Sequence, residues 1–398
     1  MELDQLKIHS KEFINSEFSP NSENWKYTNY KKFNSLTFNF TPEEKKINIQ
    51  CKPFEIIIYN GYIDQIGSAL LNKIIIENIY NAVLNNTSNC NNFFNKILPY
   101  NKNIFSAYNN IMLKLGLFIH VPKNIQINEP IKVKHIIDEG SSKSFMNFRW
   151  LILVDENSSI KIINDEKYKV NHALNTISET VVKQNAKLEL INYSFNPFSQ
   201  KFQNFAATIL NNASLNLHCI NLSGKLIKNN YFINLDGKNS ECFFNGLDIS
   251  DKKSHLDSYV EISHNKDYSK SNLDYKIISH DMSCNIFYAK SIINQLSSNC
   301  EAHQKNNNII LSPKSKIYAN PQLEIYNDEV QCSHSSTTGQ IEEESIFYLR
   351  SRGINKFDAK LLLLNGLINN MLNKLSKDIL NTIKVNQIYT FLEDVNKK

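Results

Sequence analysis

Apolar and polar residues alternate along the middle of the chain, from about Leu115 to Ser336. Short runs such as Ile160-Lys161-Ile162 and Leu188-Glu189-Leu190 place an apolar side chain at every second position. A period of two is typical of strands with one buried face, because successive side chains point to opposite sides of a sheet. We therefore expect a strand-rich core over residues 115–336.

A weak repeat lies inside this core. Asn157, Asn185, Asn212 and Asn239 each open a similar unit, at spacings of 28, 27 and 27 residues. Strands that recur at a fixed period suggest a solenoid. We expect a parallel β-helix in which each Asn hydrogen-bonds to its equivalents in the neighbouring coils. An antiparallel sandwich with Asn in its hairpin turns is the alternative, and the period is lost after about Ser250.

The segment before the core mixes helical patches with short strands. Within residues 1–114 the pattern predicts a strand at residues 54–59 and a short helix at residues 103–113. The run Trp25-Lys26-Tyr27-Thr28 is an aromatic and basic cluster. We expect its Trp and Tyr to be ordinary packing residues.

The segment after the core, residues 337–398, has a helical period. Its apolar stripe must be buried within the segment or against a partner, and it consists of Leu364, Ile368, Met371, Leu372 and Leu375. Gly353 is placed to end one helix, Asp358 to cap the next, and a later helix is expected at residues 379–392.

Composition changes this picture little. The length of 398 residues suggests two or three domains, and 41% apolar with 21% charged residues is typical of a soluble globular protein. The net charge is +5 with scattered lysines, which favours a solvated surface over a nucleic-acid interface. No apolar run approaches the roughly 20 residues that span a bilayer. Because the N-terminus also lacks a signal-peptide pattern, we expect a cytoplasmic protein.

Signatures of catalysis are missing from the sequence. There is no Walker-type phosphate loop, no G-x-S-x-G elbow and no H-E-x-x-H motif, so we expect a chain that is not an enzyme. Polysaccharide lyases also use parallel β-helices, and Glu324, Asp328 and Glu329 are candidate acids for such a carbohydrate-active enzyme. The absence of a signal peptide speaks against that alternative.

Cysteine and histidine come together only at Cys332-Ser333-His334. The seven cysteines are odd in number and form no C-x-x-C, which argues against a disulfide framework or a zinc site. On a strand Cys332 and His334 would share one face, giving two ligands suited to iron. They do not complete a four-ligand site. Judged by spacing alone, a buried Cys and a hydrogen-bonded His are the better interpretation, and a site shared with another subunit is the alternative.

Several longer strings resemble the SufB/SufD family of the SUF iron–sulfur cluster assembly system. The matching C-terminal block comprises residues 320–326 (NPQLEIY), Cys332-Ser333-His334, Gly339-Gln340 and residues 346–354 (IFYLRSRGI). The strings WKYT at residues 25–28 and FIHVP at residues 118–122 are supporting matches.

Within this family the chain resembles the SufD branch more closely than the SufB branch. SufB-like chains carry a functional Cys directly after the Phe-Tyr pair of this block, where this chain has Leu349. SufD-like chains carry Cys-Ser-His, as here. The alternative is a SufB-like scaffold that forms its own homodimer. The family usually has Gly-Ala after the His, whereas this chain has Ser335-Ser336, so we expect a local difference in geometry.

The resemblance implies a mainly β fold, in which a right-handed parallel β-helix (115–336) lies between an N-terminal α/β region (1–114) and a C-terminal helical domain (337–398). It implies a SufB-like paralogue as partner through the β-helices, and a SufC-like ABC ATPase docked on the helical domain. His334 and Cys332 would then be transient iron or cluster ligands, shared with SufB at the assembly interface. No cofactor is expected in the isolated chain, and a nascent cluster is expected in the complex. The expected docking residues for the ATPase are Phe347, Tyr348, Arg350, Arg352 and Gly353.

Overall fold

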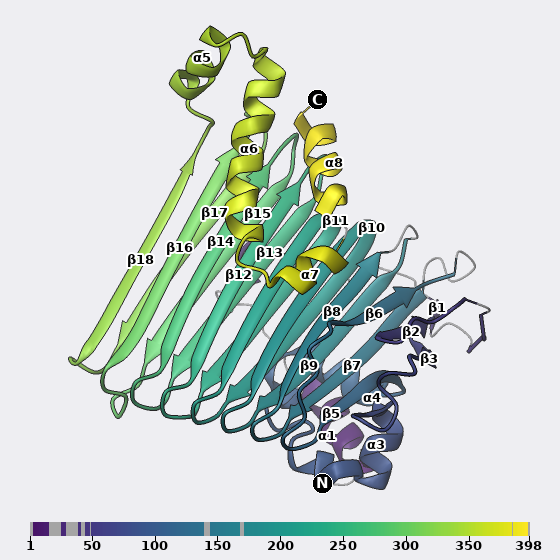
Figure 1. Ribbon diagram of the computed structural model, residues 1–398. Coiled ribbons are helices and arrows are strands. Elements are labelled where there is room, and N and C mark those ends of the chain that lie inside the picture. The colour runs from purple at the N-terminus through teal and green to yellow at the C-terminus, as the bar shows by residue number, and fades with distance from the viewer. Residues whose placement is uncertain are drawn as a thin grey trace.

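The computed structural model describes residues 3–15, 25–28, 39–40, 44–47, 49–138, 144–167, 171–383 and 385–396. Its core is a flattened solenoid whose parallel strands run side by side across the molecule (Figure 1). The strands belong to two parallel ladders, and their inner side chains meet in one apolar core. The expected parallel β-helix is therefore confirmed.

The first ladder, here called the first sheet, pairs in the order β5, β7, β9, β10, β11, β13, β15, β17. Its strands are β5 (Leu115–Val121), β7 (Ser144–Val154), β9 (Ala173–Val182), β10 (Lys187–Ile209), β11 (Ser214–Leu235), β13 (His255–His264), β15 (Cys284–Ile293) and β17 (Lys316–Ile325).

The second ladder, the second sheet, pairs in the order β2, β6, β8, β10, β11, β12, β14, β16, β18. Its further strands are β2 (Glu55–Tyr59), β6 (Ile131–Ile136), β8 (Ser159–Lys167), β12 (Glu241–Ser250), β14 (Lys270–Ser279), β16 (Cys300–Ile310) and β18 (Val330–Gly339). Strands β10 and β11 belong to both sheets, because each continues around the corner between them. Their first halves pair in the second sheet and their second halves in the first.

Asparagines stack at the corner where the chain passes from the first sheet to the second. Each Nδ2 donates to the Oδ1 of the Asn one coil earlier, at 2.9–3.2 Å, along the series Asn124, Asn157, Asn185, Asn212 and Asn239. All five residues have positive φ, between 53° and 65°. Asn tolerates this left-handed backbone better than most residues, which explains why it recurs here. The expected ladder of hydrogen bonds is confirmed.

The coils continue beyond Ser250, where the repeat in the sequence is lost. Paired residues of successive coils are 29, 31 and 30 residues apart in the series Cys242, Ser271, Ala302 and Cys332. Longer corners have replaced the regular spacing. Positive φ values also pass to residues such as Lys252, Tyr268 and Asp281. A search for Asn at 27-residue steps therefore misses coils that are present.

The N-terminal region covers the outer face of the first sheet. Its helices are α1 (Leu3–Asn15), α3 (Ile79–Asn85) and α4 (Ile104–Ile111), with 3-10 turns at Thr87–Asn92 and Tyr100–Lys102. Short strands β1 (Asn39–Phe40), β3 (Tyr62–Ile66) and β4 (Ile75–Asn78) pair with β7, β2 and β5. Apolar residues of α1 and α3 pack on Phe118, Leu151 and Leu153. The predicted strand at 54–59 and helix at 103–113 correspond to β2 and α4.

The C-terminal helices turn back along the outer face of the second sheet (Figure 1). They are α5 (Glu343–Ser351), α6 (Lys356–Leu372), α7 (Lys377–Thr382) and α8 (Val385–Asn396). The predicted apolar stripe of α6 is buried against Ile191, Ile220 and Leu247 of the solenoid. The stripe is thus buried by the chain itself. The domain limits at residues 114 and 336 stay predictions.

Two details of these helices differ from expectation. The predicted helix at 379–392 is two helices, because Ile383 adopts an extended backbone (φ −76°, ψ 148°) and ends α7. The cap of α6 is Asn355, whose side chain accepts from the backbone N–H of Asp358 at 2.9 Å. Asp358 lies three residues inside the helix and accepts from the Asn355 amide in return. The sequence analysis had named the wrong member of a reciprocal capping pair.

Candidate functional site

The Cys332-Ser333-His334 segment lies in β18, the last strand of the solenoid (Figure 1). Among the strands that the structure describes, β18 pairs with β16 alone. Ala302 pairs with Cys332 and Gln304 with His334, so the two candidate ligands follow the inward-facing side chains of the preceding coil. The expectation that they share one face is confirmed.

The two candidate ligands differ in exposure. Cys332 is half-buried and packs beside Ile293, Cys300 and Ala302. This burial raises the pKa of the Cys332 thiol, with a smaller contribution from Cys300. His334, two residues later, is exposed. Because a metal binds thiolate rather than thiol, iron would have to displace the Cys332 proton on binding.

The solenoid interior becomes polar as it approaches this end. Gln304 donates to the Ser291 hydroxyl at 2.7 Å and to the Gln322 carbonyl at 3.1 Å. On the same inner face, Ser336 donates to Asn306 at 2.9 Å. The earlier coils are filled mainly by Leu, Ile, Val and Phe. The last coil therefore places polar groups, with Cys332 and His334 among them, where an apolar core would otherwise continue.

Cys332 and His334 do not make a metal site by themselves. Over the described ranges, no three His, Cys, Asp or Glu side chains gather closely enough to hold a metal ion. Two adjacent ligands of borderline softness suit iron, but a stable cluster normally takes four. The arrangement supplies part of a ligand set at an exposed strand.

The other predicted site residues lie on α5, which follows β18 directly and projects beyond the solenoid (Figure 1). Phe347 is 71% exposed and Tyr348 57% exposed. The guanidinium of Arg352 lies 5.3 Å from the centre of the Tyr348 ring. Arg350 is also exposed. Aromatic and Arg side chains together are typical of protein-binding surfaces.

Gly353 ends α5 as the sequence predicts. Its φ of 89° is a conformation that side chains disfavour. Its N–H donates to the Arg350 carbonyl at 3.0 Å, and the Ile354 N–H donates to the Leu349 carbonyl at 3.2 Å. This pair of bonds is a Schellman motif. The role of Gly353 in the structure is therefore to stop the helix, and its docking role stays a prediction.

One feature escaped the sequence analysis: lysines that are scattered in sequence gather at the corner where the second sheet passes into the first. Lys225, Lys253, Lys314 and Lys316 line one hollow there. Lys225 and Lys253 are 28 residues apart, which is the spacing of the Asn repeat. A search for lysine at the repeat spacing would have found the first two.

Comparisons with known proteins agree with the resemblance. A family model described as "SUF system FeS cluster assembly, SufBD core domain" matches residues 135–367. The iron–sulfur cluster assembly protein SufD of Escherichia coli is 34% identical over 184 residues, or 46% of this chain and 44% of that protein. A SufBD family protein of Synechocystis is 25% identical over 283 residues, or 68% of this chain and 62% of that protein.

SufB of Bacillus subtilis is more distant, at 23% identity over 309 residues. That alignment covers 74% of this chain and 64% of SufB. The chain thus aligns with less than two thirds of the length of each of these three relatives.

Proposed function

This chain belongs to the SufB/SufD family of the SUF iron–sulfur cluster assembly system, and from that premise we propose that it is a non-catalytic, SufD-like subunit. Its role is to support de novo cluster assembly at an interface with a SufB-like partner. The observation that carries the proposal is the position of Cys332 and His334 side by side on the terminal strand of the solenoid.

The geometry of β18 supports a shared site. A terminal strand offers free backbone groups along its outer edge, and such edges pair readily with another chain. A partner that extends the sheet would bring its own side chains against Cys332 and His334. SufB-like chains would supply the thiol that this chain lacks at Leu349. Iron and sulfide are then the cargo of the complex, and this chain holds no resident cofactor.

The C-terminal helices support a second contact. We propose that α5 docks a SufC-like ABC ATPase through Phe347, Tyr348, Arg350 and Arg352, with Gly353 fixing the end of the helix. ATP hydrolysis belongs to that partner, because this chain has no phosphate-binding loop of its own. The proposed complex is cytoplasmic. In the part of the chain that the structure describes, no helix has both the length and the apolar character needed to cross a membrane.

Co-expression with the SufB-like and SufC-like proteins of the same genome tests the assembly. A stable complex of all three chains is the expected result. Isolation of the chain alone, with cleavage of a polysaccharide, would establish the lyase alternative instead. Self-association into a cluster-forming homodimer would establish the SufB-like alternative.

The site is tested by His334→Ala in the intact complex, with Ser335→Ala as the matched control. Ser335 is exposed on the same strand, but its side chain points to the opposite face. We expect the His334 variant to lower the iron and acid-labile sulfide recovered per complex, and the control to leave both unchanged. Equal cluster yields in both variants would remove His334 from the proposed site.

A further inference from the structure

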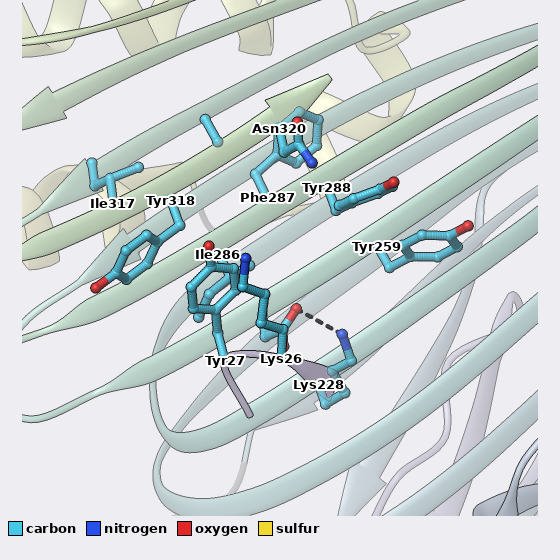
Figure 2. A pocket seen from close by; sticks show the side chains of 12 residues that line it. Lys26, Tyr27, Lys228, Tyr259, Ile286, Phe287, Tyr288, Ile317, Tyr318 and Asn320 are labelled. Atoms are coloured by element: carbon cyan, nitrogen blue, oxygen red, sulfur yellow. Dashed lines mark hydrogen bonds and ion pairs between the residues drawn. The ribbon is translucent and has the colours of Figure 1, made fainter. Parts of the chain in front are cut away.

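Two adjoining hollows lie on the outer face of the first sheet, away from β18 and α5. The first has a volume of about 420 Å³ and the second about 700 Å³. Both are lined by Tyr27 and Tyr318, whose rings stack with centres 4.4 Å apart. Figure 2 shows Tyr27 and Lys26 lying over the sheet, facing the residues that line the first hollow. We call the first the aromatic hollow and the second the basic hollow.

The segment 25–28 forms one wall of these hollows and is firmly anchored. Trp25 is buried and stacks on Phe105 and Phe202, with centres 5.7 and 6.4 Å apart. The Thr28 hydroxyl hydrogen-bonds to Nε2 of His255 at 2.9 Å and also donates to Asp257. The expectation of a packing role is thus right for Trp25. Tyr27, held between these two anchors, is 42% exposed and is available to a ligand.

The aromatic hollow offers flat surfaces. Tyr259 and Tyr288 stack with centres 5.2 Å apart on neighbouring strands, and both line it. Its single carboxylate, Asp257, is already paired with Nζ of Lys228 at 2.7 Å (Figure 2). A planar ring can enter such a space and lie against tyrosine faces.

The basic hollow offers positive charge that is not neutralised. It is lined by the four lysines Lys225, Lys253, Lys314 and Lys316 and by His255, and by no Asp or Glu. None of the four ammonium groups forms an ion pair within the residues described. The lysines come from successive coils, so they face one space from several sides. Phosphate is a ligand that such a cluster attracts.

We propose that the two hollows together bind a nucleotide, with its base in the aromatic hollow and its phosphate in the basic hollow. The shared Tyr27–Tyr318 wall puts ring recognition and charge recognition next to each other, as one molecule with a ring and a phosphate requires. The volumes lie within the range of about 300–1,000 Å³ that is usual for small-molecule sites. The charge is confined to one corner rather than spread along a stripe, which favours a mononucleotide over a nucleic acid strand. This inference does not depend on the proposed role in cluster assembly.

Calorimetric titration of the isolated full-length chain with AMP, adenosine and tripolyphosphate, in magnesium-free buffer of low ionic strength, tests the proposal. AMP should bind more tightly than either fragment. The double variant Lys314→Glu/Lys316→Glu should weaken AMP binding at least about tenfold and leave adenosine binding unchanged. Tyr27→Leu should weaken AMP and adenosine but leave tripolyphosphate unchanged. All variants change exposed side chains, and circular dichroism checks that they remain folded.

Lys238→Glu is the matched control. Lys238 is equally exposed but lies in the turn at the opposite corner of the solenoid, so its reversal should leave AMP binding unchanged. The proposal is overturned if AMP does not bind, or if all three variants bind AMP as the original chain does. Tighter binding of a single-stranded oligonucleotide or of polyglutamate than of AMP would overturn it too, because the corner would then be a docking surface for an extended polyanion. Failure of AMP binding in a chain that still assembles its complex would leave the proposed function intact.

Discussion

The Nη2 atom of Arg149 lies 2.5 Å from the Oε2 atom of Glu179, and neither side chain has any surface exposed to solvent. The same carboxylate accepts hydrogen bonds from the backbone N–H groups of Asn95, Ile97 and Leu98, at 2.9, 3.2 and 3.1 Å. This ion pair therefore fastens the N-terminal region to the outer face of the first sheet.

We expect Glu179→Gln to lower the free energy of unfolding by about 3–5 kcal/mol, because it leaves a buried guanidinium without its counter-charge. Arg149→Met should cost a similar amount for the opposite reason. The double variant should cost clearly less than the sum of the two. Urea unfolding monitored by circular dichroism measures all three. Strictly additive effects would show that the two side chains are not coupled.

The Asn ladder gives a second prediction. Asn185 lies in its middle, with φ of 58° and hydrogen bonds to Asn157 at 2.9 Å and from Asn212 at 3.2 Å. Asn185→Ala loses both bonds and puts Ala in a left-handed backbone, so we expect a loss of about 2–3 kcal/mol. Asn185→Gly loses the same bonds but relieves the backbone, and should cost about 1 kcal/mol less. Thermal unfolding of the two variants compares them directly, and equal losses would rule out a contribution from the backbone.

His264 gives the solenoid a pH-dependent stability. Burial lowers the pKa of its imidazole from 6.5 to about 4, and its ring nitrogens hydrogen-bond to Ser269 and Ser271 at 2.8 Å each. The unfolded chain takes up this proton below pH 6.5, whereas the folded chain takes it up only near pH 4. Stability from this group is therefore fully present above pH 6.5 and is lost as the pH falls towards 4.

We expect His264→Gln to flatten the fall in unfolding free energy between pH 6.5 and 4 by about 3 kcal/mol. The comparison must be between variant and original chain, because Asp248 titrates in the same window with the opposite sign. Burial raises the pKa of Asp248 from 3.8 to about 6, so its contribution favours the folded state at lower pH. Urea unfolding at a series of pH values gives the two slopes. Parallel slopes would show that His264 is protonated in the folded chain.

The exposed aromatic residues of α5 give a functional prediction. Phe347→Ala and Tyr348→Ala should each weaken the proposed docking of the ATPase by about 2 kcal/mol, as expected for an interface anchor. Stability should change by less than about 0.5 kcal/mol, because both side chains are mostly exposed. Pull-down and calorimetry with the purified ATPase measure the first quantity. Leu296→Ala is the control, since Leu296 is 87% exposed in a turn between β15 and β16.

The sequence predicted those parts of the fold that depend on local periodicity. The alternation in residues 115–336 gave the strands, and the Asn spacing gave the direction of stacking and the hydrogen-bonded ladder. The stripe of α6 identified its buried face but not the surface that buries it, because Ile191 and Ile220 are nearly two hundred residues away. The family resemblance placed Cys332 and His334 in one block. It did not show that they lie on the terminal strand.

What the sequence did not predict came from contacts between coils. The exposure of Tyr27 depends on Tyr318, almost three hundred residues later, and the gathering of Lys225 with Lys314 depends on how four coils stack. The break at Ile383 had no proline or glycine to mark it. It follows from the burial of that side chain, which is 7% exposed, in the core below the helices.

The C-terminal helices touch the solenoid from β8 to β16 but not β18. A repeat array unfolds from its ends unless something ties the repeats together, and these helices tie the middle coils. The last strand lies outside that clamp and is held by one neighbour only. Hydrogen exchange should therefore be fastest at β18 within the second sheet, while the clamped coils open as a unit. The strand that carries Cys332 and His334 can loosen and re-form without disturbing the rest of the molecule, as a hinged edge rather than a fixed wall.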